Sequence, residues 1–75
     1  MAEFAVILVH STSHAIHAER VLKRAGLPVK LIPTPRQLSS DCGSAVRIAV
    51  EDQPQSEQLL SKFKIPLDRI ELIEE

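Results

Sequence analysis

The stretch that decides the fold is FAVILVHSTSHAIHAERVLKRAG, residues 4–26. It begins with a continuous apolar run over residues 4–9, which is typical of a central strand covered on both faces. Serine and threonine at positions 11–13 then offer helix caps, and apolar residues recur three and four positions apart beyond them. We therefore predict a strand over 4–9 and a helix over 12–25 that ends at Gly26. The expected buried stripe of this helix is His14, Ala15, Ala18, Val21, Leu22 and Ala25.

Outward from this stretch, LPVKLIP at residues 27–33 predicts a second strand. Pro33, Thr34 and Pro35 end this strand, because proline cannot donate a hydrogen bond to a central ladder. Residues 36–43 form a polar loop, and residues 45–50 predict a third strand. The alternation around Ile70 and Leu72 predicts a short last strand.

A second helix is predicted between the third and last strands, ending near Lys64. Asp52 and Gln55 have the spacing of a capping box, and Pro54 suits an early helical position. The residues expected to point inward from this helix are Ser56, Leu59, Leu60 and Phe63.

The resulting β-α-β-β-α-β order is the ferredoxin-like plan of the α+β class. It predicts a four-stranded antiparallel sheet with two helices on one face, and one domain over residues 1–75. The other face is expected to be partly apolar with Arg47 as a polar exception. A homodimer through this open face is therefore an expectation.

Composition excludes several classes of function. Nine basic and ten acidic residues give a net charge of -1, which argues against nucleic-acid binding by phosphate neutralisation. No run approaches the roughly 20 apolar residues of a membrane span. Glu3 stands where a signal peptide needs a basic residue. A single cysteine closes no internal disulfide, so we expect a reduced, cytoplasmic protein.

That single cysteine, Cys42 in SSDCG at residues 39–43, is the main chemical question. Free cysteine often packs as a small hydrophobe, so its surroundings must decide. In the predicted fold, the end of the first strand, the start of the first helix and the loop after the second strand share one edge. The candidate site at this edge comprises His10, Ser11, Thr12, Ser13, His14, Arg36, Ser39, Ser40, Asp41, Cys42 and Gly43.

These residue types favour a reactive thiol. The thiolate is the nucleophile, and a helix N-terminus or a nearby cation such as Arg36 stabilises it. Gly43 is expected to allow a tight turn and access to the sulfur, whereas the charge of Asp41 acts against the thiolate. A purely structural interpretation stays open, with Arg36 as a solvated cation and Ser39 and Ser40 in turn hydrogen bonds.

The segment LIPTPRQLSSDCG at residues 31–43, preceded by STSHAIHAERVLKRAGLPVK, resembles the Putative Se/S carrier protein-like family of small, mostly bacterial domains. The resemblance runs from about His10 to Ile48. Its motifs are a Ser/Thr-rich turn with a histidine, then Pro-x-Pro-Arg, then Cys-Gly. They fall here on Ser11, Thr12, His14, Pro33, Pro35, Arg36, Cys42 and Gly43. Many relatives have two consecutive histidines in the turn, whereas this chain has Ser13 before His14, which counts against metal binding by a histidine pair.

The resemblance implies a carrier that holds sulfur or selenium on Cys42 as a persulfide or selenopersulfide and relays it from a donor enzyme to an acceptor protein. His14 would shuttle a proton. A chain with one cysteine lacks the resolving thiol of a dithiol reductase. Whether the carrier counts as a sulfurtransferase enzyme stays open.

Two alternatives remain. One is a non-catalytic binding or regulatory module that holds an anion at the first helix through Thr12, Ser13 and Arg36. The other is a metal site of His10, His14 and Cys42, which lacks a closed spacing motif. We accordingly predict no metal and no cofactor.

Overall fold

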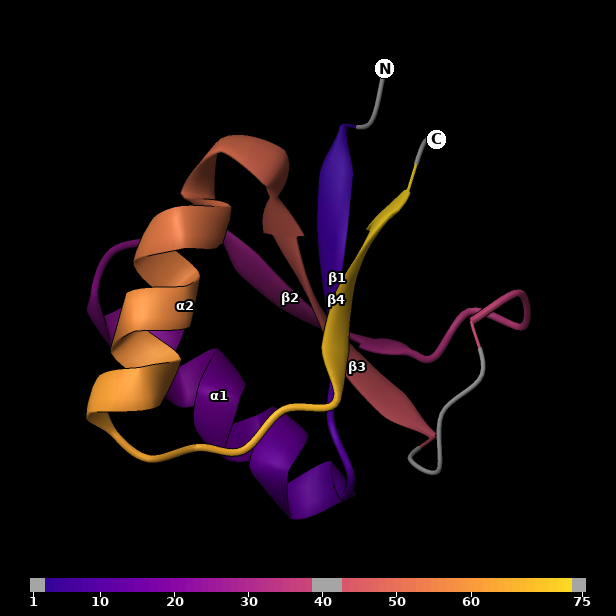
Figure 1. The fold of residues 1–75 in the computed structure, drawn as a ribbon, viewed down its shortest axis with the longest axis horizontal. Coiled ribbons are helices and arrows are strands. Elements are labelled where there is room, and N and C mark those ends of the chain that lie inside the picture. Colours follow the sequence, from indigo (N-terminus) through magenta and orange to yellow (C-terminus); the bar gives the residue numbers. More distant parts are fainter. Residues whose placement is uncertain (1–2, 39–42, 74–75) are drawn as a thin grey trace.

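Strands and helices alternate in the predicted β-α-β-β-α-β order in a computed structural model that describes residues 3–38 and 43–73 (Figure 1). A 3-10 turn, Val50–Asp52, precedes the second helix. The other elements are β1 (Phe4–Leu8), α1 (Thr12–Arg24), β2 (Val29–Pro33), β3 (Ser44–Ala49), α2 (Gln53–Lys62) and β4 (Arg69–Ile73).

The four strands form one sheet in the order β2-β3-β1-β4, and every neighbouring pair is antiparallel. Both helices lie on one side of this sheet, and α1 contacts β2, β3 and α2 (Figure 1). The α+β, ferredoxin-like architecture predicted from the sequence is therefore confirmed.

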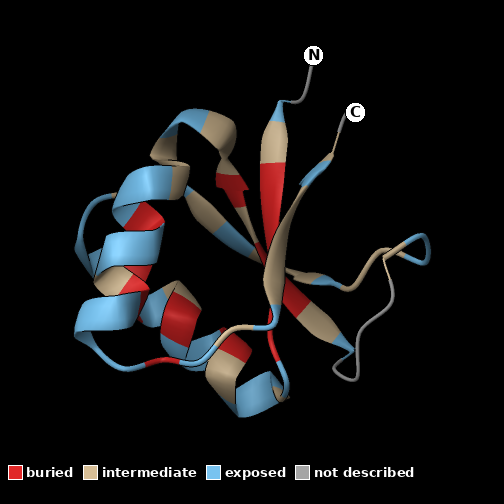
Figure 2. Ribbon diagram, viewed as in Figure 1, coloured by how far each residue is buried: buried red, intermediate tan, exposed pale blue. Residues whose placement is uncertain are grey.

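The central strand β1 is buried on both faces, as its continuous apolar run predicts. Residues 5–9 are all 0% exposed. Ala5 and Ile7 belong to the cluster beneath the helices, whereas Val6 and Leu8 form a second cluster with Ala45 on the opposite face. Figure 2 shows this buried strand running through the middle of the molecule. Burial of successive side chains on opposite faces explains why the run does not alternate.

The face opposite the helices is less open than the sequence suggests. Ile32, Leu38 and Ile73 pack against its cluster of Val6, Leu8 and Ala45. Leu38 comes from the loop after β2, which Figure 1 shows on the side of the sheet away from both helices. Val6, Leu8 and Ala45 on this face are thus buried within one chain, and a homodimer through the face stays a prediction.

The helix α1 follows the prediction closely. Its buried residues are Ala15, Ala18, Val21 and Leu22. Two other residues of the predicted buried stripe are not buried: His14 is partly exposed and Ala25 is exposed. Both lie at the ends of the helix, where the sheet no longer covers it.

The helix α2 departs from the prediction at both ends. The strand before it stops at Ala49, and Val50 starts the 3-10 turn instead. Asp52 occupies the N-cap position, but its side chain makes no capping hydrogen bond, so the predicted capping box is wrong. At the other end α2 stops at Lys62, and Phe63 is 50% exposed rather than inward.

Candidate functional site

The strand directions bring together the segments that the sequence analysis placed at one edge of the sheet. The strands β1 and β2 run in the same direction, because each is antiparallel to β3. The end of β1 therefore meets the starts of β3 and β4, and Leu8 pairs with both Ala45 and Arg69. His10 and Gly43 each lie two residues beyond the Leu8–Ala45 pair. The structure thus brings the start of α1 and the chain at Gly43 to one edge of the sheet.

Gly43 is fixed at this edge by the backbone of the preceding loop. The Thr34 N–H donates to the Gly43 carbonyl oxygen at 3.0 Å, one step beyond the Pro33–Ser44 pair. Gly43 is exposed, and a Cβ built there would meet no atom within 4 Å. The tight turn expected at Gly43 stays a prediction.

Four of the predicted site residues, Ser39, Ser40, Asp41 and Cys42, lie outside the described residues. Cys42 is nevertheless bonded directly to Gly43, whose place in the fold is described.

At the start of α1, Ser11 acts as the N-cap. Its backbone is extended, and its Oγ accepts a hydrogen bond from the His14 N–H at 3.3 Å. The same Oγ lies 3.0 Å from the Ser13 Oγ. No acidic residue occupies the first turn, so no side chain of the turn offsets the positive end of the helix dipole. Thr12 and Ser13 are exposed at this end.

His14 is half-buried, and its two ring nitrogens differ. Nδ1 is buried without a hydrogen-bond partner among the residues that the structure describes. A proton passed by His14 would therefore have to leave or enter through Nε2. His10, by contrast, is exposed at the edge.

Arg36 is not brought to the start of α1. It lies exposed in a turn closed by the hydrogen bond from the Leu38 N–H to the Pro35 carbonyl oxygen, at 3.0 Å. Figure 1 shows this turn on the side of the sheet opposite α1. The stabilisation of the thiolate by Arg36 stays a prediction.

Leu38 is a contributor to the site edge that the sequence analysis missed. It packs against Val6, Leu8 and Ala45 and so holds the loop that leads toward Cys42 on the sheet. The signal in the sequence was a single leucine within the otherwise polar residues 36–43.

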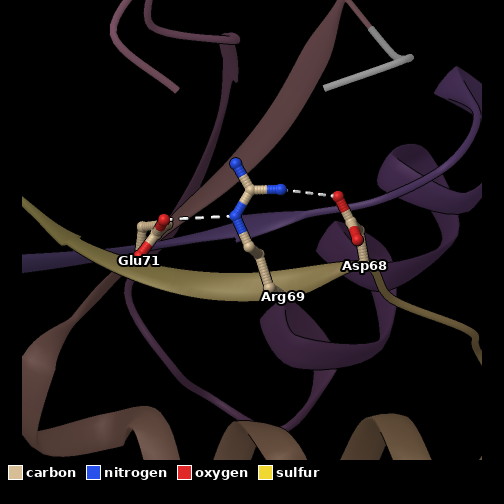
Figure 3. A network of polar contacts seen from close by, with 3 residues as sticks. All are labelled: Asp68, Arg69 and Glu71. Atoms are coloured by element: carbon tan, nitrogen blue, oxygen red, sulfur yellow. Dashed lines mark hydrogen bonds and ion pairs between the residues drawn. The ribbon is translucent and has the colours of Figure 1, made fainter. Parts of the chain in front are cut away.

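A second missed feature is a charged network at the start of β4 (Figure 3). The Arg69 NH1 donates to Asp68 Oδ2 at 2.8 Å, and its Nε donates to Glu71 Oε2 at 3.1 Å. The three side chains are 33% to 41% exposed, so each pair contributes little stability by itself. Because Arg69 pairs with Leu8, the network lies at the same edge as Gly43.

Within residues 3–38 and 43–73, no three His, Cys, Asp or Glu side chains are close enough to hold a metal ion. The proposed set of His10, His14 and Cys42 includes a residue outside these ranges. Neither α1 nor α2 has the length and apolar character needed to cross a membrane.

The fold defines a small ferredoxin-like protein of the α+β class, whose sequence contains one cysteine. The chain belongs to the family described as Putative Se/S carrier protein-like, whose family model matches residues 4–71. The match extends well beyond the motif segment that suggested the family. Neither the curated proteins nor the solved structures contain a match to this chain.

Proposed function

We propose that this protein carries sulfur or selenium on Cys42, as a persulfide or selenopersulfide, between a donor enzyme and an acceptor protein. The family match covers Cys42, and the family description names a Se/S carrier. The observation that carries the proposal is the position of Gly43, which is bonded to Cys42 and lies at the edge where α1 begins. A helix N-terminus favours an anionic sulfur, which is the reactive form.

In the loading step, the Cys42 thiolate attacks the terminal sulfur of a donor persulfide, R–S–SH. A new S–S bond forms to Cys42, and the S–S bond of the donor breaks. Its electron pair stays on the donor sulfur, which leaves as the thiolate R–S⁻. The proton remains on the transferred sulfur, so no external oxidant or reductant is needed. An acceptor thiolate unloads Cys42 by the same exchange.

Other residues of the edge support this step in the proposal. The first turn of α1, with Thr12 and Ser13, stabilises the anionic sulfur, and His14 exchanges a proton through Nε2. Arg36 adds positive charge from the loop, while Ser39, Ser40 and Gly43 shape the surroundings of the thiol. A reduced cytoplasm would keep Cys42 available as a thiol.

Persulfide loading tests the proposal. The protein is incubated with a cysteine desulfurase and cysteine, and its intact mass is measured. We expect a gain of one sulfur atom that dithiothreitol removes and that Cys42→Ser lacks. With selenocysteine as the substrate, the gain should equal one selenium atom. Absence of either gain, under conditions where an established sulfur carrier is loaded, would contradict the proposal.

The structure also leaves room for a non-catalytic binding module, because the capped first turn of α1 has no acidic side chain to repel an anion. Such a module would use Thr12 and Ser13 without covalent chemistry, and Arg36, whose turn lies on the side of the sheet opposite α1, would not take part. Complementation of a deletion strain separates the two functions. Full activity of Cys42→Ser would favour the binding module, and loss of activity would favour the carrier.

A further inference from the structure

The face of α1 that points away from the sheet carries charges of one sign. Its exposed residues recur three and four positions apart, which places them on one side of the helix. From the second turn onward, this outer face consists of Ile16, His17, Arg20, Lys23 and Arg24. It holds two arginines and a lysine but no acidic residue. Glu19, which is the one acidic residue of α1, is partly buried and lies outside this face.

The exposed acidic residues of the described chain belong to other elements, namely the residue before β1, the 3-10 turn, α2 and the residue before β4. They are Glu3, Glu51, Glu57 and Asp68. Because the whole chain has a net charge of -1, the positive charge of the outer face is a local excess. None of Arg20, Lys23 and Arg24 forms an ion pair with a residue that the structure describes.

The helix alone does not explain this face. Lys23 and Arg24 lie in its last turn, where a cation interacts favourably with the helix dipole. Arg20 lies one turn earlier, four positions before Arg24, and like charges at this spacing destabilise a helix. Ile16 lies four positions before Arg20 and is 38% exposed, although it is apolar and β-branched. Arg20 and Ile16 are therefore better explained by contacts with another molecule.

We propose that the outer face of α1 docks on an acidic surface of another protein. Arginine is enriched in protein interfaces, which have apolar centres and polar rims. The outer face offers both, with Ile16 beside the cations. Opposite charge on the partner speeds association and disfavours wrong partners. A nucleic acid fits less well, because the face has no Phe, Tyr or Trp for base stacking and the chain has a net negative charge.

The test is a backbone-amide NMR titration with a helical peptide that presents glutamates around a central leucine. A second peptide, with glutamine in place of every glutamate, is the neutral probe. The glutamate peptide should give saturable shifts centred on the outer face of α1, and the glutamine peptide should bind at least about threefold more weakly. Added salt should weaken binding of the glutamate peptide. Because the titration does not involve the thiol, its result is independent of persulfide chemistry at Cys42.

Three variants locate the binding. Arg20→Gln and Ile16→Ala should each weaken binding of the glutamate peptide by about threefold, since one removes a charge and the other apolar contact area. Lys62→Gln is the matched control and should leave the Kd unchanged, because Lys62 is an exposed cation in the last turn of the other helix. All three side chains are exposed, and the amide spectrum reports whether each variant is folded.

Any of five results would overturn the inference. The first two are no saturable shifts on the outer face at millimolar peptide, and equal affinity for the two peptides. The third is equal weakening by Arg20→Gln and Lys62→Gln, which would mean that the peptide responds to the overall charge of the protein. The fourth is unchanged affinity in Ile16→Ala. The fifth is tighter binding of a single-stranded oligouridylate with the same charge as the peptide, which would identify the face as a nucleic-acid surface.

Discussion

At the scale of single residues, both helices end in the same backbone motif with different residues at its key position. After α1, Gly26 has φ +85°, and the Leu27 N–H donates to the Leu22 carbonyl oxygen at 3.2 Å. After α2, Lys64 has φ +56°, and the Ile65 N–H donates to the Leu60 carbonyl oxygen at 2.9 Å. Both are Schellman motifs, in which the position with left-handed backbone is usually occupied by glycine.

Lys64→Gly should therefore stabilise the protein. Glycine removes the steric cost of the left-handed conformation, and this outweighs the extra freedom of the unfolded chain, for a net gain of roughly 0.5–1 kcal/mol. Lys62→Gly is the control, because Lys62 is helical and glycine there should destabilise by up to about 1 kcal/mol. Urea unfolding measures both. A loss of stability in Lys64→Gly would show that the motif does not strain the lysine.

The same motif explains why the sequence predicted Gly26 correctly and Phe63 wrongly. Glycine marks a helix end directly, whereas lysine carries no such signal. A helix continued past Lys62 would have placed Phe63 on the apolar face. The left-handed turn at Lys64 instead sends Ile65, which is 6% exposed, into the core.

At the scale of elements, the start of α1 depends on Ser11. Ser11→Ala removes the acceptor of the His14 N–H and should destabilise the protein by about 1 kcal/mol. Ser13→Ala is the matched control, since the exposed Ser13 hydroxyl contacts Ser11 but caps no described backbone group. Chemical denaturation of both variants provides the comparison. Equal losses of stability would contradict the capping role of Ser11.

The two helix starts show what a local pattern can and cannot predict. At α1 the Ser/Thr turn provides the extended backbone that a cap needs, with φ -150° and ψ 156° at Ser11. At α2 the spacing of Asp52 and Gln55 is equally suitable for a capping box. The 3-10 turn before it, however, leaves Asp52 at φ -90° and ψ 1°. From this conformation the carboxylate does not cap the helix.

At the scale of the whole molecule, element order determined the edge of the site but not its faces. The antiparallel topology brings the end of β1 and the start of β3 together, so His10 and Gly43 could be placed from the sequence. Topology does not say over which face the loop folds. The packing of Leu38 on Val6 and Leu8 decides this, and it carries the turn of Arg36 to the side opposite α1.

The central claim is that Cys42 is an activated thiolate at this edge. The most direct test is the pH dependence of its alkylation by iodoacetamide, followed by intact mass, in wild type and Arg36→Ala. Arg24→Ala, an exposed arginine in the last turn of α1, is the control. We predict that the midpoint for wild type lies below the ordinary thiol pKa of about 8.5, rises in Arg36→Ala and is unchanged in Arg24→Ala. An ordinary midpoint in wild type, or a Cys42 that iodoacetamide does not reach in the folded protein, would contradict the claim.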